Sequence, residues 1–314
     1  MSDHAYVRQY FSTHAREWLA RAYGDGGHPA SYPVGAQRVR LALEAVLDRL
    51  GFAGGHLVDM GCGGGDLGLH AVRLGFEVSG IDIASGMIAE AEARRQALPP
   101  DVRDRLKFHV ADALSSGLPP ESADAVTALG LLEYVDEDGE FFRESARLLR
   151  PGGVLVVSCR NRLFNLTSLN SYTREEIEAG AGLKLLAELE EARPTRELRD
   201  VLREFVARLR AGVADLEEAL EHDLREPAEP GTGVGGGDFA RRRRQHRPSE
   251  LAIAAAAAGF SHPQFLGVHP HLLPPAMEAI APRFYNRLAA TLEVFERLAA
   301  SLRWSSAFLG VFTR

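Results

Sequence analysis

A cluster of glycines that follows a short apolar segment is the first feature of this sequence that could do chemistry. The stretch LVDMGCGGGDLG spans residues 57–68, and Gly63, Gly65 and Gly68 match the spacing Gly-x-Gly-x-x-Gly. Glycine permits positive φ angles and a close approach of a ligand to the main chain, and the free N–H groups of the next helix would face that ligand. The spacing predicts a site for an adenosine cofactor but does not separate NAD from another such cofactor.

Three aspartates near the ends of consecutive predicted strands narrow this choice. Asp82 ends the second strand roughly 20 residues after the first glycine, where a carboxylate can accept hydrogen bonds from both hydroxyls of a ribose. Asp59 lies just before the glycines, where it would repel a pyrophosphate but suit an amino group. Asp112 follows the third strand, where it can accept a hydrogen bond from the amino group of adenine. The three carboxylates favour a cationic nucleoside that carries an amino acid.

The elements that must position these residues alternate between strand and helix. Short apolar strands and amphipathic helices follow one another from residue 37 to residue 160. We expect strands at 56–60, 76–83, 106–112, 123–130 and 154–160, and helices at 37–50, 65–75, 85–98 and 137–153. This order predicts a doubly wound, Rossmann-like α/β sheet whose ligand lies at the carboxyl ends of the strands.

The rhythm changes after Arg160. From Leu198 to Leu224, apolar residues recur at steps of three and four, which predicts one long helix with an apolar face. A Gly- and Pro-rich linker at 226–239 follows, and a further helix then starts at 247–260 with Ser249 as its cap. Strand candidates at 263–269 and 306–314, with a helical stretch at 282–302 between them, complete the sheet.

Together these motifs resemble the class I S-adenosylmethionine-dependent methyltransferases of the ubiquinone and menaquinone biosynthesis type. The resemblance rests on VDMGCGGGDLG, GIDIASGMI, VADAL, ADAVTALGLLEYV and ARLLRPGGVLVVS, between residues 41 and 158. It implies a Rossmann-like fold with a terminal antiparallel strand and S-adenosylmethionine as cofactor, released as S-adenosylhomocysteine. It implies that the methionine part lies against Asp59, Gly61, Cys62, Gly63 and Gly65, that Asp82 and Ile83 hold the ribose region, and that the adenine lies against Met87, Asp112 and Ala113, with the backbone of Leu129 nearby.

The resemblance also divides the chain into three parts. Residues 1–36 would form an N-terminal helical cap, residues 37–160 and 246–314 the cofactor-binding α/β domain, and residues 161–245 a helical insertion. The insertion's apolar face would cover the site as a lid or pack against a second copy in a homodimer. The predicted reaction is methyl transfer to a small molecule with an anionic group among the options, on oxygen first and nitrogen or carbon next. An NAD-dependent oxidoreductase and a non-catalytic nucleoside-binding protein stay open as alternatives.

Candidates for the acceptor side come from residues near strand ends. His269 and His271 follow a predicted strand, and Tyr10 lies on the amphipathic N-terminal segment; each is a candidate catalytic residue, with ordinary packing as the alternative. Arg160 and Arg162 follow the fifth strand, where a guanidinium can bind an acceptor anion. Tyr134 is a third candidate for acceptor binding; it stands where related sequences often have His after Glu, so a His base at that position is absent here.

Composition sets the outer limits. The chain has 314 residues, a net charge of -7 and 46% apolar residues, which argues for a globular protein with a sizeable core and against broad nucleic-acid binding. The basic run at 241–247 is interpreted first as a solvated turn, then as an anion-binding lid or a nucleic-acid patch. Cys62 and Cys159 lie far apart, without metal-ligand spacing, and no signal peptide or long apolar segment is present. We therefore expect a cytoplasmic protein with no metal site and no membrane partner.

Overall fold

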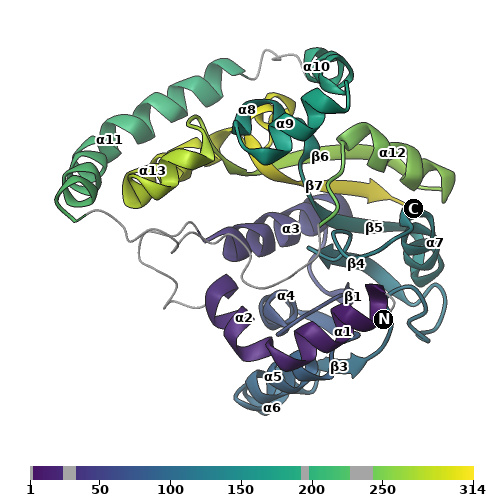
Figure 1. The fold of residues 1–314 in the computed structure, drawn as a ribbon. Coiled ribbons are helices and arrows are strands. Elements are labelled where there is room, and N and C mark those ends of the chain that lie inside the picture. The colour runs from purple at the N-terminus through teal and green to yellow at the C-terminus, as the bar shows by residue number, and fades with distance from the viewer. Residues whose placement is uncertain (1–2, 24–32, 192–197, 227–242) are drawn as a thin grey trace.

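A seven-stranded mixed sheet forms the centre of the computed structural model, which describes residues 3–23, 33–191, 198–226 and 243–314. The strand order is β3-β2-β1-β4-β5-β7-β6 (Figure 1). The strands are β1 Gly55–Met60, β2 Phe76–Asp82, β3 Leu106–Val110, β4 Ala123–Leu129, β5 Leu149–Arg160, β6 Ser261–Pro270 and β7 Ser305–Thr313. The first five are parallel, while β7 runs antiparallel to both β5 and β6. The predicted fold, including its terminal antiparallel strand, is confirmed.

Helices cover both faces of the sheet. On one face α3 (Val34–Leu50), α4 (Asp66–Ala71) and α5 (Ser85–Gln96) pack against a core of aliphatic residues from β1, β2, β5, β6 and β7. On the other face α7 (Asp138–Leu148) and α12 (Pro248–Ala257) bury an aromatic core. The order of the strands reverses between β1 and β4, and the glycine segment leaves the sheet at this point. The two short helices η1 (Val72–Leu74) and α6 (Pro100–Arg103) complete the connections to β2 and β3.

The N-terminal helices α1 (Asp3–Thr13) and α2 (Ala15–Tyr23) lie over α5 (Figure 1). Apolar side chains of α1 form a small core with Ala84 and Met87 at the start of α5. Gly86 allows this contact, because a Cβ at that position would overlap the carbonyl oxygen of Ser12. The N-terminal segment therefore packs beside the glycine segment that follows β1.

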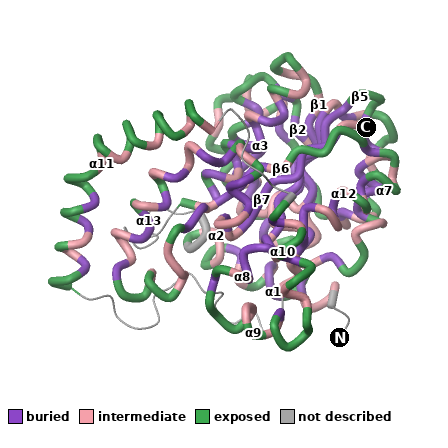
Figure 2. The backbone as a smooth tube through the Cα atoms, turned by 90° about the horizontal axis from the view of Figure 1, so that it is seen from above, coloured by how far each residue is buried: buried purple, intermediate pink, exposed green. Residues whose placement is uncertain are grey.

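After β5 the chain forms the helices η2 (Arg162–Phe164), α8 (Asn165–Ser168), α9 (Ser171–Glu178), α10 (Gly182–Glu191) and α11 (Leu198–Arg225). Helix α11 packs along α13 (Pro282–Thr291), where Asp223 accepts a hydrogen bond from the Phe284 N–H. It also contacts η4 (Leu292–Phe295), where the ring centres of Phe205 and Phe295 lie 5.2 Å apart. Its other side faces outward (Figure 2). Within the described ranges, no helix has both the length and the apolar character that a membrane span needs.

Several predicted boundaries were wrong. The predicted helix at 282–302 is divided into α13, η4 (Leu292–Phe295) and η5 (Ala299–Arg303), after η3 (Pro275–Ala279). Strand β5 begins at Leu149 instead of residue 154. Ser249 does not cap α12, because that helix begins at Pro248 and the Ser249 hydroxyl donates to Glu188. Most of the predicted linker at 226–239 lies outside the described residues.

The close contact between α1 and α5 leads to a first prediction. Gly86→Ala should lower the free energy of unfolding by about 1–3 kcal/mol, because the added methyl group overlaps the Ser12 carbonyl and must push α1 away. Gly212→Ala in α11 is the matched control, since nothing lies within 4 Å of its added Cβ and alanine favours a helix by up to about 1 kcal/mol. Urea unfolding of both variants checks this. Equal stability of the two variants would contradict the contact.

Candidate functional site

Asp82 organises the carboxyl edge of the sheet. One carboxylate oxygen accepts a hydrogen bond of 3.0 Å from the Gly63 N–H, and the other accepts one of 2.8 Å from the Ala84 N–H. Burial raises the pKa of Asp82, and these backbone donors partly offset the rise. The side chain is half-buried, and its carboxylate holds the glycine segment through the Gly63 N–H.

The glycines of the motif differ in what surrounds them. Gly63 has a φ of +52°, and no protein atom lies within 4 Å of a Cβ built there. A Cβ at Gly65, in contrast, would meet the ring of Phe108 and the side chain of Ala91, and one at Gly64 would meet Leu19. The absence of a side chain at Gly65 therefore serves the packing of α4 against the sheet, and the predicted contact of its backbone with the methionine part of the cofactor stays a prediction. Gly63 is the position where the backbone lies open to a ligand.

Asp59 lies one residue before the end of β1 and is 3% exposed. The Thr127 hydroxyl of β4 donates to its carboxylate at 2.8 Å. Burial raises the pKa of Asp59 to about 7; the Thr127 bond lowers it, and the charge of Asp82 raises it further. A carboxyl that titrates near neutral pH beside the glycine segment can hold or release a proton when a cationic group binds.

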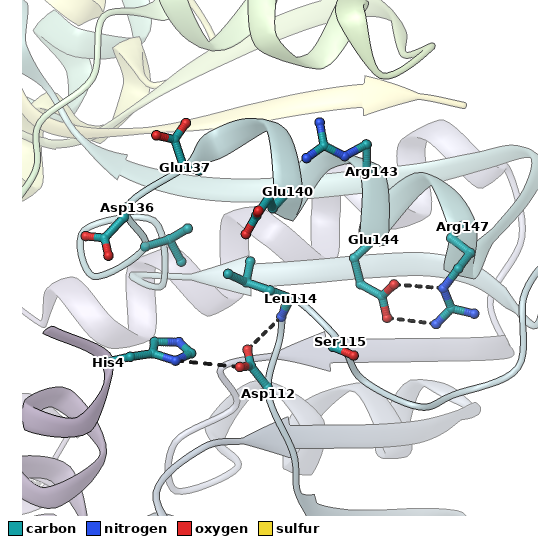
Figure 3. Close-up of a pocket in the computed structure, with 11 residues that line it drawn as sticks. His4, Asp112, Leu114, Ser115, Asp136, Glu137, Glu140, Arg143, Glu144 and Arg147 are labelled. Atoms are coloured by element: carbon teal, nitrogen blue, oxygen red, sulfur yellow. Dashed lines mark hydrogen bonds and ion pairs between the residues drawn. The ribbon is translucent and has the colours of Figure 1, made fainter. Parts of the chain in front are cut away.

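Asp112 follows β3 and faces an open groove between α1 and α7 (Figure 3). The groove has a volume of about 670 Å³, and His4 of α1 points toward Asp112, with its Nδ1 3.6 Å from the carboxylate. Asp112 also accepts the Leu114 N–H at 2.9 Å. Across the groove, Glu144 and Arg147 pair with each other. Among the described residues, no group of acidic, His or Cys side chains has the arrangement of a metal site.

The remaining residues of the predicted cofactor set lie along the same edge. Gly61 and Cys62 both donate their N–H groups to the Ile81 carbonyl, and burial raises the pKa of the Cys62 thiol. Met87 is buried beneath α1 and Ala113 is buried after β3, while Ile83 and Leu129 are half-buried at the ends of β2 and β4. The structure thus brings the set to one edge, with Met87 covered by protein.

A second group of side chains gathers beyond β4 and β5. Arg160 ends β5, and its guanidinium carbon lies 5.9 Å from the centre of the Tyr172 ring. Arg38, in the first turns of α3, lies near Gly130 at the end of β4. Burial raises the pKa of the Tyr134 hydroxyl to about 12, and the positive charges of both guanidinium groups partly offset this rise. Arg38 lies outside every sequence motif, so no local pattern indicated it.

The other predicted cations are used inside the protein. Arg162 donates two hydrogen bonds of 2.8 Å to Glu176, which is 5% exposed, so its position fits the alternative of an arginine paired within the protein. Arg244 pairs with Asp138, and Arg247 pairs with Glu188 and Glu250. Arg244 and Arg247 of the basic run thus join α7, α10 and α12 through ion pairs. Arg241 and Arg242 lie outside the described residues.

His269 and His271 lie side by side, with ring centres 3.8 Å apart. His269 has a φ of +53°, and its N–H donates to the Gln37 side chain of α3. Burial lowers the pKa of His271 to about 3, and burial, followed by the charge of His271, lowers that of His269 well below the ordinary value. An efficient general base needs a pKa near the working pH. The histidines therefore lack the proton affinity that the predicted base role requires.

Tyr10, the third catalytic candidate, belongs to the small core between α1 and α5. It is 9% exposed, and its ring contacts those of Phe11 and His14, with centres 5.2 Å and 4.8 Å away. Its position fits the alternative of plain packing. Tyr134 contacts the same core through Phe11, at 5.2 Å between ring centres, and so lies between α1 and the arginines.

The known proteins that this chain resembles in sequence are methyltransferases. Residues 58–157 match the family model described as a methyltransferase domain. A ubiquinone biosynthesis O-methyltransferase of Xanthomonas euvesicatoria is 38% identical over 120 residues, which cover 38% of this chain and 49% of that protein. The mitochondrial ubiquinone biosynthesis O-methyltransferase of Schizosaccharomyces pombe is 31% identical over 153 residues, or 49% of this chain and 54% of that protein. The chain thus spans about half the length of these relatives.

A solved structure extends the similarity to the whole fold. The magnesium protoporphyrin IX methyltransferase of Synechocystis, with bound S-adenosylhomocysteine, superposes with a TM-score of 0.56 at 18% identity, covering 100% of both chains. At this identity the likeness concerns the fold alone. It supports the sheet order and the flanking helices described above.

The pKa of Asp59 leads to a prediction about stability. Between pH 5 and pH 8 the folded protein loses a proton from a buried carboxyl that is already ionised in the unfolded chain, so its free energy of unfolding falls. Asp59→Asn should remove this term and gain on the order of 2 kcal/mol over wild type as the pH rises across that range.

Asp124→Asn is the control for this measurement. Burial raises the pKa of Asp124, but hydrogen bonds from the His56 N–H and Arg150 outweigh it, and the net shift is downward. Its stabilising contribution is fully present above about pH 5, so the variant should lose stability by a constant amount from pH 5 to pH 8. Urea unfolding at both pH values checks this. If Asp59→Asn follows the wild-type slope, the buried carboxyl is not the cause.

Proposed function

We propose that this chain is a class I S-adenosylmethionine-dependent methyltransferase that transfers a methyl group to a small-molecule acceptor, which the methyltransferase domain match at residues 58–157 supports. One observation carries the proposal: Asp82 holds the open Gly63 backbone and presents its carboxylate beside it. A nucleoside with an amino-acid tail fits this arrangement, because the ribose hydroxyls can donate to Asp82 while the tail lies along the segment at Gly63.

The residues present fit the cofactor's charges. Asp59 and Asp82 are neighbouring carboxyls whose pKa values are raised by burial, and a positive ligand between them would favour their ionised forms. A pyrophosphate would instead add negative charge beside them, so the NAD-dependent alternative lacks support. The cofactor supplies an activated methyl group on a sulfonium centre. The protein's contribution is to align the acceptor and exclude water.

An oxygen atom is the proposed accepting atom, supported by the relatives that are named O-methyltransferases. We infer that His269 and His271 do not remove the acceptor's proton, because burial lowers the pKa of both imidazoles and so makes them weak bases. An accepting oxygen then needs a low pKa of its own or one lowered by nearby cations. Arg38 and Arg160 are the cations in position to do so.

We further propose a reducing cytoplasm as the site of action, since Cys62 and Cys159 are both free buried thiols. Nucleic acid is not proposed as a partner, because Arg244 and Arg247 of the basic run are paired within the protein. A homodimer through α11 stays a prediction. It is motivated by Leu202 and Val206, which are 43% and 41% exposed on that helix.

Cofactor binding supplies the first test. Calorimetry should show micromolar binding of S-adenosylhomocysteine and no binding of NAD. Gly63→Ala should weaken the former by roughly tenfold or more, because its methyl group fills the space left for the ligand. Gly152→Ala is the matched control, since Gly152 also has a positive φ and open surroundings but lies in the turn within β5. Equal losses in both variants would assign the effect to backbone strain.

Turnover supplies the second test. Incubation with S-adenosylmethionine and a metabolite extract should yield a product heavier by the mass of one CH₂ group, detected by mass spectrometry. Asp82→Ala should abolish product formation together with binding, because the ribose loses its carboxylate partner and Gly63 loses its acceptor. Binding without any turnover across extracts would favour the non-catalytic nucleoside-binding protein.

A further inference from the structure

Arg38 and Arg160 differ from most arginines of this protein in their partners. Most others, such as Arg94, Arg147 and Arg162, pair with a carboxylate. For Arg38 and Arg160, no carboxylate of the described residues lies within ion-pair distance, and the Nε atom of each is buried without a hydrogen-bond partner there. Burying a charged donor without a partner costs free energy, so such a pair indicates a bound group of opposite charge.

The two guanidinium groups approach one place from two elements. Side chains alternate along β5, so Arg160 lies on the same face as Val154 and Val156, which pack in the core shared with α3. Arg38 projects from the start of α3, and its Nη1 lies 3.6 Å from a Cβ built at Gly130. Gly130 also donates its N–H to the Ser158 hydroxyl of β5, two residues before Arg160, and the charges of both guanidinium groups lower the pKa of Tyr134, so both lie near the ends of β4 and β5.

The surrounding charges leave this region positive. The charge of Arg243 also lowers the pKa of the Tyr134 hydroxyl, while the negative charge of Glu133 raises it. His269 and His271, beyond Arg38, contribute no charge at neutral pH. Nearby Asp138 is already paired with Arg244 and His246, so it does not neutralise Arg38. Even without Arg243, the two cations Arg38 and Arg160 against the one carboxylate of Glu133 leave an excess of positive charge.

We propose that the acceptor carries an oxyanion, a carboxylate or a phosphate, that Arg38 and Arg160 bind jointly at the carboxyl ends of β4 and β5. The planar guanidinium presents paired N–H donors that match either group. The Tyr172 ring holds Arg160 from one side, and Arg38 extends from the rigid start of α3. This deepens the proposed methyl transfer and rests on it, since it names the class of molecule that is methylated.

Binding of simple probes tests the site. Protein saturated with S-adenosylhomocysteine is titrated calorimetrically with benzoate, phenyl phosphate and neutral benzamide. At least one oxyanion should bind, and benzamide should not. Arg38→Gln and Arg160→Gln should each weaken oxyanion binding by roughly tenfold to a hundredfold, the usual loss for a charge-assisted hydrogen bond. Arg73→Gln, an exposed arginine on η1, should match wild type.

Two readouts separate this proposal from folding and from the proposed function. Urea unfolding should show the Gln variants at least as stable as wild type, because no ion pair within the described protein is lost. S-adenosylhomocysteine affinity should be the same in all variants, and failure of wild type to bind it would overturn the methyltransferase proposal alone. Equal binding of benzamide, binding of no oxyanion, or unchanged probe affinity in both Gln variants would overturn the oxyanion site.

Fractionation of the extract tests the natural acceptor. Methylated product should form from the fraction that an anion exchanger retains, and product formed only from the unretained fraction would overturn the proposal. Phosphatase treatment of the retained fraction then separates the two sources of charge. Loss of the acceptor after treatment identifies a phosphate, and survival identifies a carboxylate.

Discussion

The rest of the site depends on the hydrogen bond between Asp82 and the Gly63 N–H. It joins the ends of β1 and β2 at the point where the sheet order reverses, and it holds an open stretch of backbone against a half-buried carboxylate. The same carboxylate also receives the Ala84 N–H at the start of α5. One side chain thus sets the positions of two helix entries and of the surface that a nucleoside would contact.

Acidic and basic side chains occupy different parts of this edge. Carboxyls lie toward β1 and β2, where burial raises the pKa of Asp59 and Asp82. Cations lie toward β4 and β5, where the charges of Arg38 and Arg160 lower the pKa of Tyr134. A cationic cofactor and an anionic acceptor would therefore each meet the opposite charge. The two ends of the site would thus attract the cofactor and the acceptor separately, through side-chain charges.

The sequence predicted the cofactor side of the site better than the acceptor side. Asp82 and Gly63 belong to a motif in which strand, turn and helix follow within a few residues, so local spacing determines their placement. Arg38 lies about twenty residues before that motif and reaches the site only because α3 packs on the sheet. The ion pair of Arg162 could not be predicted either, because its partner, Glu176, comes from the helical insertion, whose packing has no local signal.

Burial was the other property that residue types did not reveal. Gly65 fits the ligand motif by spacing, yet the ring of Phe108 explains why no side chain is allowed there. His269 and His271 have the residue type of a base, but their surroundings exclude water and lower their pKa values. Such features depend on contacts between segments far apart in the chain, which periodicity and composition do not specify.

The neighbours Gln37 and Arg38 have different tasks on one helical turn. Gln37 is anchored to the sheet side through the His269 N–H and through the buried Glu296, so the backbone beneath Arg38 has little room to shift. A preorganised guanidinium on an immobile support selects ligands by fixed distance instead of adapting to them. Larger or smaller molecules would have to be accommodated by the outer helices, which makes those the place where specificity can diverge while the methyl-transfer geometry is preserved.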